Sequence, residues 1–224
     1  AQMIRKKFGE KNAVLCIGPA GEMQLRSASI QVTDPDGNPC RAAGRGGLGA
    51  LMAAKGLKAV VVDDTDGQSP RIADPELFRS GQKKVAEAIR NHPFTGQAMP
   101  ALGTAMVVAV INAIGAFPAL NSRTGTYEKW EQLSGEALAE LINRRGGQPT
   151  HAGCSTCIIR CSNVFLDSDK KYVTSGLEYE TLWALGGMCD IPDLDVIARF
   201  DYLCDDLGID TMNTGCAIAV AMEA

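Results

Sequence analysis

The sequence predicts an α+β protein in which a small α/β unit precedes a larger, mostly helical domain. Two observations support this order. Residues 1–65 alternate short apolar segments with the period of a strand and short helical segments. After a polar, turn-rich segment at 64–73, the pattern changes to the longer period of amphipathic helices. We therefore expect one domain over 1–65 and a second over 66–224.

The first domain is expected to contain three strands and one glycine-rich loop. The strands fit 12–17, 25–33 and 57–62, which are apolar or alternate in polarity and are bounded by Gly, Pro or Asp. Residues 34–37 (Asp-Pro-Asp-Gly) have the composition of a turn. The glycine-rich loop at 41–49 follows and leads into a short helix.

The second domain is expected to be built from helices joined by two long loop-rich stretches. The first helix begins at Asp74, because Asp is a good N-cap and Pro75 suits the first turn. Further helices fit 103–115, 134–145, 178–188, 193–207 and 212–223. The segments 116–132 and 146–177 are expected to be loops.

Composition narrows the class of protein. The 224 residues are 46% hydrophobic and 21% charged, with a net charge of −4, which argues against a nucleic-acid or anionic-membrane surface. The longest apolar run, 105–120, is interrupted by Asn112, Gly115 and Pro118, so we expect no membrane span. Residues 1–7 read as the middle of an amphipathic helix, and we interpret the chain as part of a longer one.

Eight cysteines are present, and they divide into two groups. Five lie among apolar or small residues, where a free thiol packs as a small hydrophobe. Nothing in their spacing indicates a secreted disulfide scaffold, so a reducing cytoplasm is the expected location. These five are Cys16, Cys40, Cys189, Cys204 and Cys216.

The other three, Cys154, Cys157 and Cys161, have the spacing C-x₂-C-x₃-C. Three thiols in one short loop can share a metal centre, and iron–sulfur clusters are held by cysteine thiolates, typically four. A structural zinc site is the alternative, but zinc loops usually pair two C-x₂-C knuckles and no second knuckle is present. The bulky Ile158 and Ile159 fit a loop wrapped over a buried cluster.

The glycine-rich loop allows two interpretations. Gly44, Gly46 and Gly47 could expose backbone N–H groups to an anion, with Arg41 and Arg45 adding charge suited to phosphate. The same glycines could instead permit close packing. The pattern is neither the dinucleotide-binding fingerprint nor a P-loop.

Two groups of carboxylates remain. Glu178 and Glu180 open a helix, where acidic side chains stabilise the positive end of the dipole. Asp205, Gly208 and Asp210 form the pattern D-x-x-G-x-D at the junction of two helices. Capping by Asp210 explains that residue but not the whole pattern.

Taken together, these segments resemble the tungsten- or molybdenum-containing aldehyde ferredoxin oxidoreductase family. Each motif alone is modestly specific, but their order is highly specific. The resemblance extends nearly end to end, through 17–22, 41–50, 55–59, 103–105, 134–136, 153–161, 178–186 and 205–215.

The resemblance implies a set of cofactors: a tungsten (or molybdenum) bis-pyranopterin, a magnesium ion bridging its phosphates, and a 4Fe–4S cluster. It implies an enzyme that oxidises an aldehyde and passes electrons through the cluster to ferredoxin, with Glu180 as a candidate for proton transfer. The cluster ligands would be Cys154, Cys157 and Cys161. The residues implied to bind the pterin and its magnesium are Arg41, Ala42, Gly44, Arg45, Asp205, Gly208, Asp210 and Thr211.

The resemblance also implies what is absent. Family members are considerably longer, so residues 1–65 would be the end of a pterin-binding N-terminal domain and 66–224 an incomplete helical domain. A fourth cluster ligand and further pterin contacts would lie elsewhere, and we expect the 224-residue piece alone to be inactive and to lose its cofactors. His92 and His151 match no family histidine and are expected at the surface.

Some relatives bind a metal across a homodimer interface through Glu-x-x-His, but Arg199 and Tyr202 occupy those positions here, so no such metal is expected. The sequence does not fix the oligomeric state or the substrate. Two other functions stay open: an iron–sulfur electron-transfer module without pterin, and a zinc-stabilised structural domain.

Overall fold

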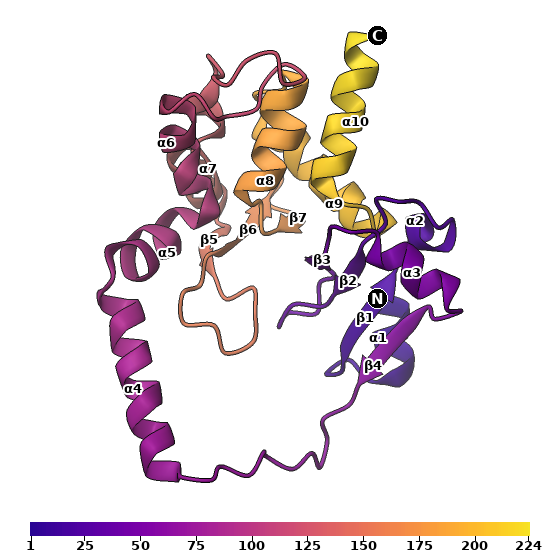
Figure 1. The fold of residues 1–224 in the computed structure, drawn as a ribbon, viewed down its shortest axis with the longest axis vertical. Coiled ribbons are helices and arrows are strands. Elements are labelled where there is room, and N and C mark those ends of the chain that lie inside the picture. The colour runs from indigo at the N-terminus through magenta and orange to yellow at the C-terminus, as the bar shows by residue number, and fades with distance from the viewer.

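A computed structural model describes residues 1–224 and has the α+β architecture that the sequence predicts. Figure 1 shows a small N-terminal domain beside a larger helical one, connected by an extended segment before α4. The strands are β1 (Ala13–Ile17), β2 (Ile30–Val32), β3 (Arg41–Ala43), β4 (Ala59–Val62), β5 (Gln148–His151), β6 (Ser162–Leu166) and β7 (Tyr172–Ser175). The helices of the first domain are α1 (Gln2–Phe8), α2 (Pro19–Glu22) and α3 (Leu48–Ala54).

The N-terminal domain contains one antiparallel sheet in the order β3-β2-β1-β4. Two predictions for it were wrong in detail. The strand expected over 25–33 is confined to Ile30–Val32, and the glycine-rich segment begins as strand β3. β3 is added to the sheet edge by pairing with β2, with Ala42 opposite Gln31, and this pairing turns Arg41 toward the second domain.

The second domain begins with α4 (Pro75–Asn91), capped by the Asp74 side chain as predicted. Its C-terminal pair, α9 (Leu194–Leu207) and α10 (Thr211–Glu223), also match the predicted helices closely. The remaining helical elements are η1 (Phe94–Ala98), α5 (Met99–Leu102), η2 (Gly103–Val107), α6 (Val108–Ala113), η3 (Trp130–Leu133), α7 (Gly135–Arg145), α8 (Tyr179–Thr181), η4 (Leu182–Gly186) and η5 (Gly187–Cys189).

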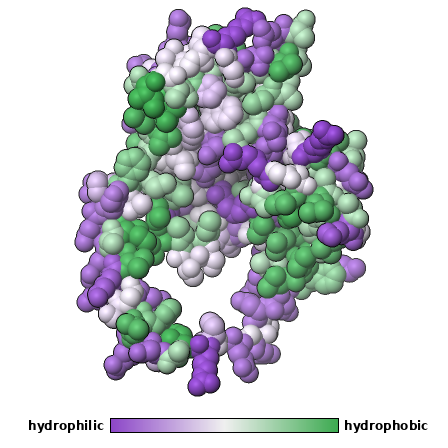
Figure 2. All heavy atoms as spheres, in the orientation of Figure 1, coloured by the Kyte–Doolittle hydropathy of each residue, from purple (hydrophilic) through white to green (hydrophobic).

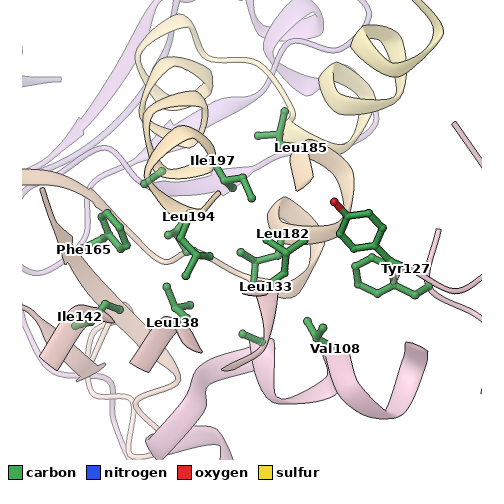
Figure 3. Close-up of a cluster of buried hydrophobic side chains, with 14 of the residues drawn as sticks. Val108, Tyr127, Leu133, Leu138, Ile142, Phe165, Leu182, Leu185, Leu194 and Ile197 are labelled. Atoms are coloured by element: carbon green, nitrogen blue, oxygen red, sulfur yellow. The ribbon is translucent and has the colours of Figure 1, made fainter. Parts of the chain in front are cut away.

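The main hydrophobic core lies within this second domain. Figure 3 shows side chains from α6, α7, η4 and α9 meeting around Leu133 and Leu182, which are fully buried. Burying a Leu side chain contributes about 2 kcal/mol. Phe117 and Tyr127, from the expected loop 116–132, join the same core, so this loop is packed although it is irregular.

The expectation of a loop-rich segment at 146–177 was wrong. Three short antiparallel strands form a second sheet there, in the order β5-β6-β7. Only the stretch between β5 and β6, which carries the three clustered cysteines, is a loop. The sheet therefore holds the two ends of the cysteine loop, and a bridge between His151 and Cys161 closes it.

The turn between α9 and α10 joins the two domains through backbone contacts. Ser29 N donates to Gly208 O at 2.9 Å, and Asp210 N donates to Ser27 O at 2.9 Å. Each domain contributes a glycine to this contact, Gly18 from the first and Gly208 from the second. A Cβ on Gly18 would lie 2.3 Å from Leu207 O. Gly208 itself has a φ of 67°, which favours glycine.

Two apolar surfaces stand out. The first is the helical stretch Phe94–Ala113, which is long and apolar enough to cross a membrane by length and composition alone, whereas the sequence predicted no such span. Two of its residues, Ala105 and Val108, lie in the core, and one helix of this kind is weak evidence of a span. Figure 2 shows a second apolar area over α2, α3 and β4, where Leu51 and Val62 are exposed.

Candidate functional site

Residues from three distant parts of the sequence line one cavity of about 610 Å³ between the two domains. The glycine-rich segment, the start of α8 and the junction of α9 and α10 each supply part of its wall. Most residues that the sequence singled out therefore come together. Those lining the cavity are Arg41, Ala42, Gly44, Arg45, Cys154, Glu180, Asp205, Asp210 and Thr211.

Three of the predicted residues do not line this cavity. Gly208 lies behind the wall, where it holds the α9–α10 turn against the first domain. Cys157 and Cys161 belong to the loop that places Cys154 at the edge of the cavity.

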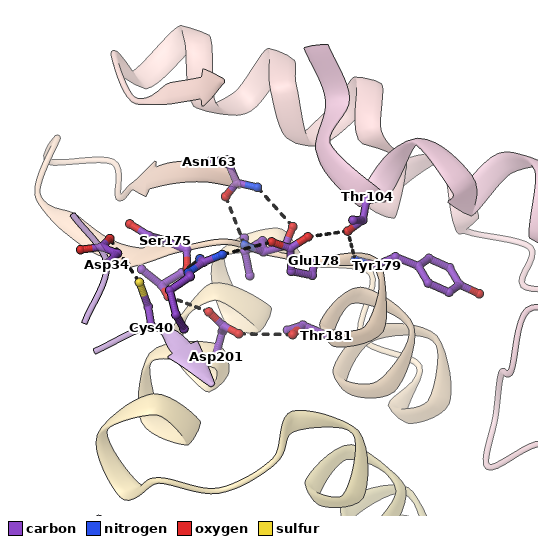
Figure 4. Close-up of polar contacts among 12 residues, drawn as sticks. Asp34, Cys40, Thr104, Asn163, Ser175, Glu178, Tyr179, Thr181 and Asp201 are labelled. Carbon is purple, nitrogen blue, oxygen red and sulfur yellow. Dashed lines mark hydrogen bonds and ion pairs between the residues drawn. The ribbon is translucent and has the colours of Figure 1, made fainter. Parts of the chain in front are cut away.

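Arg41 extends from β3 into the second domain. Its Nη2 donates to Ser175 O at 2.8 Å, and its Nη1 lies 3.5 Å from Glu178 Oε1 (Figure 4). The second domain accommodates the guanidinium through glycines, because a Cβ on Gly176 would lie 1.9 Å from Arg41 Nη2 and one on Gly153 2.9 Å from Nη1. Arg41 thus lines the cavity and connects the domains at once.

Glu178 and Glu180 have different environments although only one residue separates them. Glu178 is held from two sides: Thr104 Oγ1 donates to its Oε2 at 2.6 Å, and Arg41 pairs with its Oε1. Burial raises the pKa of Glu178. Its carboxylate makes no cap bond to α8, so helix-start stabilisation does not explain it. Glu180 lines the cavity and no other protein group bonds its carboxylate.

The aspartate motif combines capping with cavity lining. Asp210 caps α10 by accepting from Met212 N at 3.4 Å and from Asn213 N at 3.0 Å. The Asp205 carboxylate forms no hydrogen bond or ion pair with other protein groups. The motif therefore presents one carboxylate occupied by the backbone and one available to a ligand.

Asp201, which belongs to none of the predicted motifs, lies one helical turn before Asp205 and is buried at the cavity wall. It accepts from Thr174 Oγ1 at 2.6 Å and from Thr181 Oγ1 at 3.3 Å, and Thr181 is 3.2 Å from Thr211 Oγ1. These hydroxyls connect β7, α8, α9 and α10. Figure 4 shows the contact between Asp201 and Thr181. The available signal was an acid four residues before Asp205 on an otherwise apolar helix face.

The Asp201 carboxylate perturbs the neighbouring Asp205. Burial raises the pKa of Asp201, and burial followed by the charge of Asp201 raises the pKa of Asp205. Ionising Asp205 therefore costs more in the folded chain than in the unfolded one. The contribution of Asp205 to the free energy of unfolding is therefore most favourable at low pH, and it is lost as the pH rises above the ordinary pKa of an Asp, about 4.

We therefore expect Asp205→Asn to stabilise the 224-residue chain at pH 7 by about 1–2 kcal/mol. The gain should shrink toward zero near pH 3, where the wild-type carboxyl is largely protonated in both the folded and the unfolded state. Urea unfolding at several pH values measures it. Asp206→Asn, on an exposed neighbour, is the control and should change little. A gain for Asp205→Asn that is equal at both pH values would contradict the assignment.

The cysteine loop was predicted to wrap over a buried cluster, but several of its side chains are exposed. Cys154 is exposed, Cys157 and Cys161 are half-buried, and all three are free. Ile158 is 41% exposed, so the isoleucines do not cover a buried centre within this chain. The three sulfurs are also not grouped within 4.8 Å of one another, which is wider than a single zinc ion requires.

The cavity has the features of a polar ligand site. Three buried polar atoms at its wall have no hydrogen-bond partner in the protein: Arg41 Nε, Gln31 Oε1 and Ser175 Oγ. Unpaired buried polar groups are costly unless a ligand or water satisfies them. Gly44 lies beside Asp210 in the wall, where a Cβ would make an ordinary contact of 3.6 Å with Asp210 Oδ1. The residues present therefore fit a large polar group with phosphates.

Comparison with known proteins gives consistent matches over the whole chain. A family model described as aldehyde ferredoxin oxidoreductase, domains 2 and 3, matches residues 81–224, and the N-terminal domain model of the same name matches residues 1–64. Tungsten-containing aldehyde ferredoxin oxidoreductases from Pyrococcus furiosus and Thermococcus kodakarensis are 40% and 39% identical, each over 98% of this chain.

These relatives are longer proteins. The chain spans 34% of the length of both. Among solved structures, the active-site complex of a benzoyl coenzyme A reductase bound to a dienoyl-CoA matches with a TM-score of 0.75 and 24% identity. The match covers 99% of this chain and 33% of the other, and it supports the fold alone.

Proposed function

We propose that this chain, which belongs to the aldehyde ferredoxin oxidoreductase family, is part of a longer oxidoreductase. In that protein it would hold one side of a tungsten-pterin cofactor and most of an iron–sulfur cluster. The proposed reaction is the oxidation of an aldehyde to a carboxylic acid, with ferredoxin as electron acceptor.

One observation carries this proposal: residues from the segments 41–45, 175–181 and 205–212 line one cavity although these segments are far apart in the sequence. Arg41 and Arg45 supply fixed positive charge for phosphate, and the Ala42 carbonyl is an oxygen ligand of the kind that magnesium prefers. Asp205 and Thr211 offer an acceptor and a hydroxyl on the opposite wall. When bound, the metal and pterin would supply the two-electron chemistry and the route for electrons.

Glu180 is proposed to handle the proton of the reaction. Oxidising an aldehyde adds an oxygen from water and releases two protons with the two electrons, so a base in the cavity is needed. Glu180 is the acid at the start of α8 that lines the cavity without a structural partner, whereas Glu178 is committed to Arg41 and Thr104. Cys154, Cys157 and Cys161 are proposed as three cluster ligands, with a fourth from outside this chain.

The test is analysis of the full-length protein, produced without oxygen and with tungstate supplied. We expect tungsten, pterin, iron and acid-labile sulfide in one preparation, together with aldehyde-dependent reduction of ferredoxin. The 224-residue chain alone should show no activity. Iron and sulfide without tungsten or pterin would instead indicate an electron-transfer module. Zinc bound by the cysteine loop without sulfide would indicate a structural domain.

A further inference from the structure

His151 was expected at the surface, but that prediction was wrong: its side chain is buried, with 7% exposed. It ends β5, two residues before the cysteine loop begins. Its Nε2 lies 2.7 Å from Oδ2 of Asp36, which belongs to the turn between β2 and β3 of the first domain. This contact joins segments 115 residues apart in the sequence.

The other ring nitrogen of His151 is unpaired. Nδ1 is buried and has no hydrogen-bond partner. Nε2 is the ring nitrogen that faces Asp36, so it is the atom that an ion between the two side chains would meet. A neutral imidazole coordinates a metal ion through one ring nitrogen and leaves the other for a hydrogen bond.

A second carboxylate, Asp34, completes the group. It is buried, and its oxygens accept from Asn38 N at 2.8 Å and from Cys40 Sγ at 3.3 Å (Figure 4). No Lys or Arg forms an ion pair with Asp34 or Asp36. Two neighbouring carboxylates without a cationic side chain leave negative charge that a bound cation would neutralise.

We propose that Asp34, Asp36 and His151 bind one zinc ion between the two domains. One ligand atom from each residue lies within 4.8 Å of the other two. The ligand atoms of a tetrahedral zinc ion lie about 3.3 Å apart for bonds of about 2 Å, so a rotation of the Asp36 side chain, which is 60% exposed, would be needed to bring the three atoms to that spacing.

The donor set indicates the class of ion. One imidazole with two carboxylates suits zinc, whereas calcium and magnesium prefer oxygen ligands throughout. Three protein ligands leave a fourth position for water. The Cys40 thiol, hydrogen-bonded to Asp34, orients that carboxylate from the outer shell.

The ion would connect the β2–β3 turn of the first domain to the strand that precedes the cysteine loop. A cavity of about 430 Å³ beside it is lined by Asp34, Arg41, Gly153 and Cys154. Zinc here would therefore stabilise the domain interface and the start of that loop. This site is separate from the proposed cysteine cluster and from the pterin cavity, and it does not depend on the proposed function.

The experiment must exclude zinc binding by the cysteine loop. The test therefore uses the 224-residue chain that carries Cys154→Ser, Cys157→Ser and Cys161→Ser together. This chain would be stripped of metal with a chelator and titrated with zinc chloride in a calorimeter. We expect one zinc per chain, and a melting temperature that rises with zinc concentration, because an ion that binds only the folded chain stabilises it.

Two further substitutions in this background test the ligands. His151→Gln and Asp36→Asn should each weaken binding by more than about tenfold, the loss that outer-shell changes alone can cause. Asp36 is exposed, so Asp36→Asn keeps the test decisive if His151→Gln fails to fold. The matched control is His92→Gln, on the other histidine, which is exposed and should leave binding unchanged.

The proposal is overturned if the triple-serine chain binds no zinc, or binds it equally well after both ligand substitutions. His151 and Asp36 would then form an ion pair only. Because the three loop thiols are absent from this background, either result leaves the cluster and pterin assignments untouched.

Discussion

Changing Cys157 to Ser in the full-length protein is expected to remove most of its iron and acid-labile sulfide. Three thiolates from one loop carry most of the cluster, and a serine hydroxyl is a poor replacement because it is not deprotonated near neutral pH. With two loop ligands left, the centre should assemble poorly and oxidise easily. Iron and sulfide analysis of anaerobically purified protein measures the loss, and ferredoxin reduction should fall with it.

Cys216→Ser is the matched control for this experiment. Cys216 is also half-buried, but it lies on α10 and is not part of the cysteine loop. It should retain wild-type iron. If Cys157→Ser kept its full iron and sulfide content, the loop would not hold the cluster, and the electron path proposed for the enzyme would have no starting point.

Changing Arg41 to Ala is expected to lower the free energy of unfolding of the 224-residue chain by about 3 kcal/mol. The substitution removes the hydrogen bond to Ser175 O and leaves the half-buried Glu178 carboxylate without its cation. Both contacts cross the domain interface, so their loss also loosens the cavity. Denaturant unfolding measures the stability, and pterin content of the full-length protein should fall in parallel.

Two variants separate the causes of that loss. Arg45→Ala removes a cavity arginine that forms no ion pair, so it should leave stability nearly unchanged. Adding Glu178→Gln to Arg41→Ala should recover part of the stability, because the unpaired charge is then gone. Equal stability of Arg41→Ala and the wild-type chain would show that Arg41 does not hold the domains together.

Local sequence chemistry determined the helices that begin with a capping side chain. Asp74, Ser134 and Asp193 each accept hydrogen bonds from backbone N–H groups within the next three residues, so the information for these starts is contained in a short segment. The same holds for Asp210 at α10. The order of motifs also identified the family, because each motif keeps its residues together in the chain.

Burial, strand pairing and the contacts between domains were decided only by the tertiary structure. The sheet β5-β6-β7 was missed because its short strands contain Gln, Pro, Ser and Asn and depend on each other for hydrogen bonds. The environments of Arg41 and His151 depend on residues more than 100 positions away. No local pattern records such partners, because their energies arise from packing two domains against each other and from removing water between them.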